Sequence, residues 1–380
     1  MSRLPYSLPT ITPHGQGLVN QLGRLREERV QADIDGVPVA RLTAEYGSPL
    51  FVYSERTLRQ KARQMRAAFA AAYPRVRLLW SYKTNYLDAI CGLLHQEGWD
   101  AEVVSELEYA MARRLGVPGP RIVCNGAHKP RRWLERAVAE GALVQLDHFD
   151  ELLLLEDVAR ARGQRLAVGI RVNLRAPSLG GSWERFGFNL ESGEALDAAL
   201  RVAQSPWLQL RGIHCHLGTF IPLPEAYAES ARRLCRLLGR IEERTGEPIE
   251  KLNLGGGFPT KYLKDVPPVV QYGRSIFRAL RKHFGNQIPE TIIEPGRGMV
   301  GNAGIIETEV VLISKKSDED EVRWVYLDIG KFGGLAETMD ESIRYAIRTP
   351  HDGAEMAPCV LAGPTCDSAD VLYEKLPYPL

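Results

Sequence analysis

Short apolar runs alternate with longer stretches of helical periodicity along most of the chain. The stretches between the runs carry apolar residues three and four positions apart, which is the spacing of an amphipathic helix. Strands that alternate with helices favour a parallel sheet built from βα units. The runs rich in Val, Ile and Leu are 76–81, 101–105, 121–125, 143–148, 166–172, 211–217, 251–255 and 291–295. Eight strands with helices between them predict a (β/α)8 barrel.

An open, doubly wound sheet is the alternative arrangement of the same elements. That fold commonly binds a dinucleotide through a G-x-G-x-x-G turn after its first strand. No such turn follows residues 76–81. The barrel is therefore the favoured α/β fold.

The two ends of the chain have a different pattern. Short strands are expected at 37–42 and 48–54, and two longer β-type runs, 303–316 and 321–330, are joined by a polar turn, which favours antiparallel pairing. We therefore predict a β-rich domain built from residues 1–55 and 298–380, with the barrel (56–297) inserted between them. The chain stops soon after another apolar strand, CVLAG (359–363), so the C-terminal part of this domain is expected to be incomplete.

Composition excludes several classes of protein. The chain has 380 residues, of which 44% are hydrophobic and 25% charged, and its net charge is +1. This balance favours neither nucleic acid nor an anionic membrane as a partner, and no run approaches the roughly 18 apolar residues of a membrane helix. The six cysteines have no CxxC pair and no zinc spacing, so we expect reduced thiols and no metal site. The N-terminus has no apolar signal core, and a cytoplasmic protein is expected.

Catalytic residues of barrels lie where the strands end, on the C-terminal face. Lys83 follows the first strand in WSYKTN, and a lysine amine at a barrel mouth can form a Schiff base. A surface lysine at a strand end is an equally ordinary interpretation. Arg171 and His216 end two further strands, and His214 shares the strand face of His216. His216 is the better ligand candidate because it lies nearer the C-terminal end; His214 is expected to be a satisfied core residue.

Two loops late in the barrel suggest an anion site. Gly255, Gly256 and Gly257 follow the seventh strand, and glycines without side chains let backbone N–H groups approach a phosphate. Barrel phosphate sites often lie after strands seven and eight. Glu294 ends the eighth strand and Arg297 follows, so the acid can bond a protonated ring nitrogen and the arginine a phosphate. A flexible turn and a Glu–Arg pair that closes the barrel are the structural alternatives.

The order of these motifs resembles a known family. Y-K-x-N at 82–85, H-x-G-T at 216–219, GGGF at 255–258, EPGR at 294–297 and GPTCDSAD at 363–370 occur in sequence. They resemble the motifs of the alanine-racemase-like, fold-type III pyridoxal-phosphate decarboxylases, which include diaminopimelate, ornithine, lysine and arginine decarboxylases. The resemblance runs from about residue 45 to residue 374.

The resemblance implies pyridoxal 5'-phosphate as the cofactor and a role for each matching residue. Lys83 would hold the cofactor as a Schiff base, His216 would stack on its ring, and Glu294 would bond the ring nitrogen. Cys366 resembles the acid that protonates the α-carbon after carbon dioxide leaves, and Asp367 the residue that meets the distal end of the substrate. In this family the 366–367 loop reaches the active site of the other subunit, which implies a homodimer with shared sites. Further cofactor-binding candidates are Arg171, Thr219, Gly255, Gly256, Gly257 and Arg297.

Decarboxylation is the reaction that the resemblance favours. A carboxylate such as Glu294 keeps the ring nitrogen protonated and deepens the electron sink of the cofactor, whereas the resembled racemases present an arginine there. A racemase, a non-catalytic cofactor carrier and a regulatory homologue remain alternatives. A carrier would not need Cys366, and a regulatory homologue would be expected to lose Lys83 or Cys366.

The substrate signals conflict. Arg344 suggests the arginine that diaminopimelate decarboxylases offer to a distal carboxylate, while Asp367 resembles the enzymes that act on distal amines. Tyr345 is a third substrate candidate, and the next residue, Ala346, replaces the acid of ornithine decarboxylases. Glu102 and Arg185 also depart from the family pattern. We expect a basic or diamino amino acid, or a conjugate of one, as in siderophore or antibiotic pathways.

Overall fold

The structure is a computed structural model that describes residues 32–175, 184–262, 265–341 and 343–379. Eight parallel strands form a closed ring, in which each strand pairs with the next and β10 pairs with β8 to complete the circle. The predicted (β/α)8 barrel is thereby confirmed. The barrel strands are β4 (Val76–Ser81), β5 (Asp100–Val103), β6 (Ile122–Cys124), β7 (Leu143–Leu146), β8 (Leu166–Asn173), β10 (Leu208–His214), β11 (Lys251–Asn253) and β12 (Glu290–Ile293).

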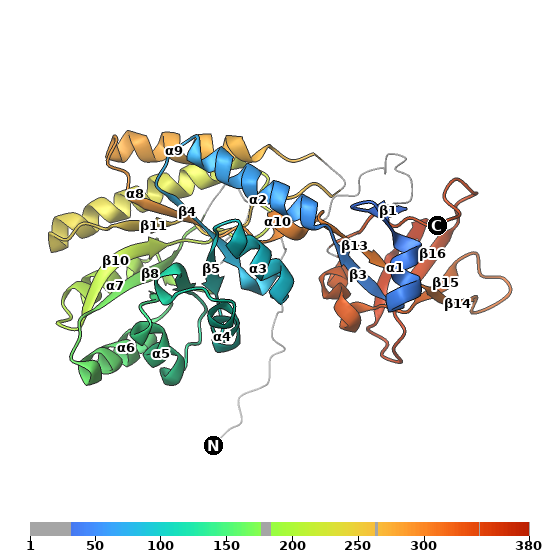
Figure 1. Cartoon of the computed structure of the whole chain (residues 1–380), viewed down its shortest axis with the longest axis horizontal. Coiled ribbons are helices and arrows are strands. Elements are labelled where there is room, and N and C mark those ends of the chain that lie inside the picture. Colours follow the sequence, from blue (N-terminus) through green and yellow to red (C-terminus); the bar gives the residue numbers. More distant parts are fainter. Residues whose placement is uncertain (1–31, 176–183, 263–264, 342, 380) are drawn as a thin grey trace, which may run out of the picture.

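Helices surround the ring on the outside (Figure 1). Each buries one apolar stripe against the strands, as α2 does with Leu58, Ala62, Met65 and Phe69. Ser54 begins α2 by accepting a hydrogen bond from the Thr57 N–H at 3.0 Å, which is an ordinary helix cap. The helices are α2 (Glu55–Ala70), α3 (Asp88–Gln96), α4 (Glu106–Arg114), α5 (Arg131–Ala139), α6 (Phe149–Arg162), α7 (Glu194–Ala203), α8 (Pro224–Thr245), α9 (Val269–Phe284) and the short α10 (Arg297–Val300); a short strand, β9 (Phe188–Asn189), pairs with β8.

A buried ion pair fixes one side of the barrel. Lys129 and Glu151 are almost completely buried, and the Lys129 Nζ lies 2.7 Å from the Glu151 Oε1. The same ammonium group donates to the carbonyl oxygens of Gly126 and Gln145, at 2.7 and 2.9 Å. Burial raises the pKa of Glu151 despite this partner. Each buried charge is therefore stabilised by the other, and removing either residue would leave a buried charge without its partner.

Replacing Lys129 with methionine should lower the free energy of unfolding by about 3–5 kcal/mol, because it leaves the Glu151 carboxylate buried without its cation. Urea unfolding followed by circular dichroism measures this loss. The double variant Lys129→Met, Glu151→Leu is the control, and it should recover much of the stability because no buried charge remains. A single variant as stable as the unmodified chain would show that Glu151 has another way to be neutralised.

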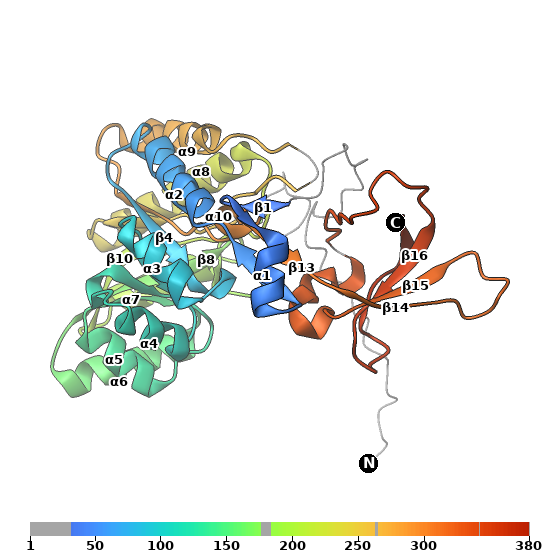
Figure 2. The ribbon, with the colours of Figure 1, turned by 45° about the vertical axis from the view of Figure 1, so that its right-hand side comes forward.

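Both ends of the chain contribute to a β-rich part beside the barrel, as Figures 1 and 2 show. β3 (Leu50–Tyr53) from the N-terminal side pairs antiparallel with β13 (Gly304–Glu307), which follows the barrel. A four-stranded sheet has the order β14-β15-β16-β17 and consists of β14 (Val310–Ser314), β15 (Arg323–Leu327), β16 (Pro358–Ala362) and β17 (Val371–Pro379). This confirms the second, β-rich domain and the antiparallel pair on either side of the polar turn. The domain boundaries at residues 55/56 and 297/298 stay a prediction.

Two local predictions were wrong. Residues 37–42 do not form one strand: β1 (Asp33–Ile34) and β2 (Val37–Pro38) make a small hairpin, and α1 (Val39–Tyr46) begins directly after Pro38. The run 303–316 forms two strands, β13 and β14, because the residues between them are hydrogen-bonded to Asp328, which directly follows β15. Its carboxylate accepts hydrogen bonds from the Thr308 hydroxyl at 2.5 Å and the Glu309 N–H at 3.0 Å. Within the described parts of the chain, no helix has the length and apolarity needed to cross a lipid bilayer.

Candidate active site

Lys83 lies at the mouth of the barrel in a tight turn, Tyr82–Thr84, that continues β4. Trp80 and Tyr82, which both precede Lys83, are completely buried and anchor the turn. The Lys83 side chain is 45% exposed, and its Nζ lies 2.6 Å from the Oε2 of Glu102, which is fully buried on β5. The amine is therefore accessible to a ligand while a carboxylate fixes its position.

A polar network links Lys83 to Glu294 across the barrel mouth. Besides Lys83, Glu102 accepts hydrogen bonds from the Ser81 hydroxyl at 2.5 Å and the Asn125 amide at 2.9 Å. The same Asn125 amide donates to the Glu294 Oε1 at 2.9 Å, and the Asn253 amide donates to that oxygen at 2.6 Å. Two carboxylates from β5 and β12, the strands on either side of β4, are thus joined through one amide.

Glu294 is ionised in this network. Burial alone would raise the pKa of its carboxyl, but the charge and hydrogen bond of His214, the charge of Lys83 and the hydrogen bond from Asn253 together lower it well below the usual range. His214 Nε2 lies 3.4 Å from the Glu294 Oε2. His214 is buried in the core, as expected, but it is not an ordinary core residue, because its Nε2 lies beside the acid of the candidate site.

His216 is held as a neutral imidazole. Burial lowers the pKa of His216 well below its ordinary value, and the positive charges of Lys83 and Arg171 lower it further. The Gly256 N–H donates to the His216 Nδ1 at 3.2 Å, which leaves the ring proton on Nε2. Arg171, one strand away on β8, lies 3.7 Å from the Asp147 Oδ1 through its Nη1. These two predicted residues therefore share one side of the barrel mouth.

The glycine loop packs against its neighbours more closely than any side chain would allow. A Cβ on Gly256 would lie 2.2 Å from the Glu294 carbonyl oxygen, and one on Gly257, where φ is +92°, 2.3 Å from the Gly218 carbonyl oxygen. The N–H groups of Gly255 and Gly256 already donate to Asn253 and His216. Gly257 is the one of the three for which the described residues supply no N–H acceptor. The loop can therefore offer an anion one free glycine N–H rather than the three that we expected.

Arg297 completes the phosphate side of the site. Its Nε donates to the Thr219 Oγ1 at 3.1 Å, and its Nη1 donates to the Tyr262 hydroxyl at 3.2 Å. Glu337, from the β-rich part, forms a two-pronged ion pair with the same guanidinium group. Thr219, the free glycine N–H and Arg297 thus converge as donors from three loops.

The residues of the barrel mouth fit pyridoxal 5'-phosphate. Lys83 supplies an accessible amine, Glu294 an ionised carboxylate for a ring N–H, and Thr219, Gly257 and Arg297 phosphate donors. The buried Asn125 Oδ1 at the same mouth has no hydrogen-bond partner among the described residues. Buried polar atoms are rarely left without partners, so this oxygen indicates a polar ligand in the mouth.

The predicted substrate residues do not all lie together. The Tyr345 hydroxyl is 3.5 Å from the Glu337 Oε2, which places Tyr345 beside Arg297. Arg344 instead lies over the ring of Tyr373, with its Cζ 5.0 Å from the ring centroid. Asp367 caps its own loop by accepting from the Ala369 N–H at 2.8 Å. Cys366 is exposed in that loop. The hydrogen bonds that hold the loop join Thr365 to Asp370 and Asp367 to Thr365, and neither involves a residue of the barrel mouth.

Cys366 should be the one cysteine that reacts rapidly with a thiol reagent in the native protein. It is exposed, whereas the other five cysteines are buried, and burial raises the pKa of each of those thiols. Reaction with a chromogenic disulfide at pH 8 should release one equivalent quickly. Cys366→Ser should abolish that phase, while Cys359→Ser, a buried control, should leave it. Several fast thiols in the native protein would contradict this placement.

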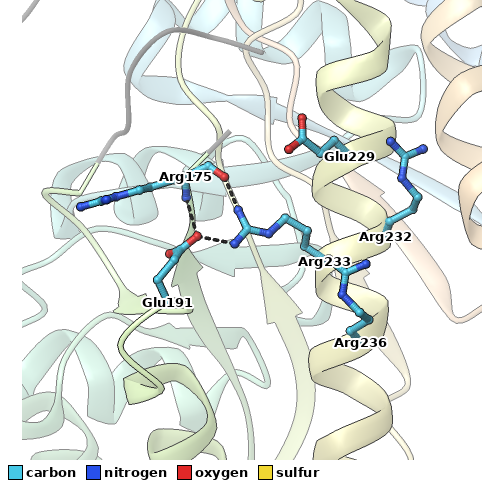
Figure 3. Close-up of a pocket in the computed structure, with 6 residues that line it drawn as sticks. All are labelled: Arg175, Glu191, Glu229, Arg232, Arg233 and Arg236. Atoms are coloured by element: carbon cyan, nitrogen blue, oxygen red, sulfur yellow. Dashed lines mark hydrogen bonds and ion pairs between the residues drawn. The ribbon is translucent and has the colours of Figure 1, made fainter. Parts of the chain in front are cut away.

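A separate hollow of about 370 Å³ lies between α8 and the segments that carry Arg175 and Glu191 (Figure 3). It is lined by Arg175, Glu191, Glu229, Arg232, Arg233 and Arg236, none of which is a predicted site residue. Arg233 is paired with Glu191 at 2.5 Å and also donates to the Arg175 carbonyl oxygen. We therefore place the chemistry at the barrel mouth and not in this hollow.

Sequence reasoning missed several residues of the site. Glu102 was recognised only as a departure from the family pattern, and no role was predicted for Asn125 or for Asn253, which lies two residues before Gly255. Their position at the ends of barrel strands was the signal that could have found them. Glu337 and Tyr262 had no such signal, because their place beside Arg297 depends on how the loops and the β-rich part fold.

Comparison with known proteins gives one consistent result. Residues 55–301 match the family model described as "Pyridoxal-dependent decarboxylase, pyridoxal binding domain". The chain is 32% identical to a diaminopimelate decarboxylase of Actinosynnema pretiosum, across 93% of this chain and 80% of the relative, and 30% identical to that of Bacillus subtilis, across 96% and 84%. The crystal structure of diaminopimelate decarboxylase from M. jannaschii superposes with a TM-score of 0.81 at 26% identity, covering 92% of this chain and 83% of that one. The chain therefore belongs to the pyridoxal-dependent decarboxylases of fold type III, and it is an amino-acid decarboxylase that uses pyridoxal 5'-phosphate.

Proposed function

We propose that this enzyme removes the α-carboxylate of a basic or diamino amino acid, or of a conjugate of one. The observation that carries the proposal is the ionised Glu294 in a network that reaches Lys83, because these are the two groups that a cofactor ring and its aldehyde need. Its curated relatives are named diaminopimelate decarboxylases, and one solved relative at 26% identity is described in complex with L-lysine. These names support a substrate with a second polar end.

When bound, the cofactor supplies an electron sink for the charge left on the α-carbon. The roles that we assign to the protein's residues follow from the site. Lys83 holds the cofactor aldehyde, neutral His216 covers the ring, and Glu294 keeps a proton on the ring nitrogen. Arg171 assists beside His216, and Thr219, Gly257 and Arg297 bind the phosphate, with Gly255 and Gly256 shaping the loop. Cys366 donates a proton to the α-carbon.

The candidate residues for the distal end of the substrate lie apart from one another. Tyr345 and Glu337 lie together beside Arg297, so this corner offers both a carboxylate and a guanidinium group. Asp367 supports a distal amine, whereas Arg344, which is stacked on Tyr373, gives no support to a distal carboxylate site. We favour a substrate whose distal group is cationic.

The test is carbon dioxide release from a panel of 1-¹³C-labelled amino acids: lysine, ornithine, arginine, diaminopimelate and glutamate. We expect release from one or more of the first four in the presence of pyridoxal 5'-phosphate, and none from glutamate. The Lys83→Ala variant is the control, because any carbon dioxide that it releases does not come from the proposed site. Exchange of the α-proton without carbon dioxide would instead favour the racemase alternative.

We further infer that the enzyme is a homodimer with shared active sites. Cys366 and Asp367 belong to the β-rich part, and both are exposed in the single chain. β14 is an edge strand whose Val310, Val311, Leu312 and Ile313 are 47–57% exposed, so apolar side chains project from both faces. Such a surface is typical of one that a partner covers.

The free cysteines also support a reducing compartment such as the cytoplasm.

Complementation tests the shared site. A mixture of Lys83→Ala and Cys366→Ala proteins should form heterodimers with one intact site and one doubly damaged site. Random exchange should then restore about a quarter of the activity of the unmodified enzyme. Mass spectrometry of the mixture must show the heterodimer. Exchange without recovered activity would refute the shared site.

A further inference from the structure

A lysine with no acidic partner lies behind the two loops of the proposed phosphate site. Lys61 is on α2, and its Nζ donates to the Gly298 carbonyl oxygen at 2.9 Å and to the Thr260 Oγ1 at 3.3 Å. Gly298 directly follows Arg297, and Thr260 lies three residues after Gly257. One ammonium group therefore joins the loop after β11 to the loop after β12.

The two loops have little freedom once they are joined. A Cβ on Gly298 would lie 2.9 Å from the Phe258 carbonyl oxygen, and one on Gly301 would lie 2.6 Å from the Thr260 Cγ2. Thr260 is 3% exposed. A shift of Lys61 would therefore move both loops, and with them the donors of Gly257 and Arg297.

The charge of Lys61 is not balanced by the protein. Within the described residues, no carboxylate oxygen lies within ion-pair distance of its Nζ, although the amine is largely withdrawn from water. Burial lowers the pKa of Lys61 to about 8. The charge of Arg297, by contrast, is already shared with Glu337. A partly buried cation without a counter-ion is costly, and a phosphate dianion placed between these loops would remove that cost.

We propose that Lys61 is a positioning residue of the phosphate site, whose ammonium group fixes both phosphate-side loops and balances the charge of the cofactor's phosphate. The proposal rests on the phosphate site assigned above. Lys61 acts through the Gly298 carbonyl and the Thr260 hydroxyl and through its charge, and it need not touch the cofactor.

The test compares the affinity of the protein for pyridoxal 5'-phosphate with its affinity for pyridoxal, which lacks the phosphate. The two ligands share one ring, and the hemiacetal that free pyridoxal forms in water affects its affinity equally for every variant. A change in the ratio of the two dissociation constants between variants therefore isolates the phosphate contribution. Lys61→Met should reduce this ratio at least fivefold, through weaker binding of the phosphorylated ligand, with pyridoxal affinity changed less than twofold. Lys61→Arg should keep the ratio within twofold of the unmodified chain. Lys282→Met, at an exposed lysine of α9, is the matched control and should change neither affinity.

The possible outcomes distinguish an error in the role of Lys61 from an error in the location of the phosphate site. An unmodified chain that binds the two ligands equally well would show that the phosphate site is misplaced. A preference for the phosphorylated ligand that Arg297→Ala removes and Lys61→Met leaves unchanged would keep the site and overturn the role of Lys61. Equal weakening of both ligands by Lys61→Met would also overturn it, because a purely structural lysine would act on both.

A pH profile of the unmodified chain tests the charge without any variant, in case Lys61→Met does not fold. Lys61 is charged below about pH 8 and neutral above it, so the affinity ratio should fall as pH rises from 7.5 to 9. Carboxylates, imidazoles, phenols and guanidinium groups ordinarily titrate outside this range, and burial raises the pKa of Cys91 to about 12. A flat profile would overturn the role of the Lys61 charge.

The titratable groups on α2 and on the elements packed against it are Glu55, Arg56, Arg59, Arg63, Arg66, Arg77, Asp88, Cys91, His95, Lys261, Tyr262, Tyr272, Arg274, Arg278, Arg281, Lys282, His283 and Arg297.

Discussion

Replacing Lys83 with alanine should reduce decarboxylation by roughly 10³-fold or more, because the variant lacks the amine that would hold the cofactor aldehyde. The fold should survive the change. The Lys83 side chain is 45% exposed, and Glu102 keeps its hydrogen bonds from Ser81 and Asn125. A melting temperature close to that of the unmodified enzyme should therefore accompany the loss of turnover.

The position of the cofactor provides a second measurement. Borohydride treatment of the cofactor-loaded enzyme, followed by peptide mapping, should find the cofactor attached to the peptide that contains Lys83. Lys61→Arg is the control, because it changes another lysine near the site and should leave the adduct in place. An adduct on a different lysine, or normal turnover by Lys83→Ala, would refute the assignment.

Replacing Glu294 with glutamine should lower turnover by about 10²–10³-fold, with cofactor affinity changed less than tenfold. The amide has the shape of the carboxylate and still presents an oxygen to Asn125 and Asn253, but it carries no charge to retain a proton on the ring nitrogen. The phosphate donors Thr219, Gly257 and Arg297 are unchanged in the variant and continue to bind the cofactor. Turnover at saturating cofactor, measured beside a cofactor titration, separates the two effects.

The pH dependence gives Glu294 a further signature. His214, Lys83 and Asn253 lower its pKa well below the ordinary range despite its burial, so the carboxylate stays ionised as pH falls from 8 to 5. The pKa of His216 is also lowered, by burial and by Lys83 and Arg171, so its imidazole stays neutral over the same range. Neither group should produce a loss of kcat between pH 8 and 5. Near-normal turnover by Glu294→Gln would mean that the ring nitrogen needs no anionic partner, which would favour racemase chemistry.

The sequence by itself determined the barrel and the positions of its chemistry. Strand β4 occupies the six residues of the first predicted run, and each of the other seven predicted runs overlaps a barrel strand. Periodicity succeeds here because a strand buried on both faces must be apolar throughout, and each covering helix must be apolar on one side. Lys83, Glu294 and Arg297 could be placed at the mouth because all parallel strands of a barrel end on the same face.

Only the tertiary structure decided which polar groups meet. The single amide that bridges Glu102 and Glu294 comes from Asn125, 169 residues before Glu294, and the acid on Arg297 comes from Glu337, 40 residues after it. The structure also assigned two of the three glycine N–H groups to Asn253 and His216, a pairing that no local pattern contains. Strand periodicity specifies which side of an element is buried. Ring closure, loop packing and the docking of the β-rich part decide which buried polar groups come within hydrogen-bond distance, since these depend on contacts between residues far apart in the chain.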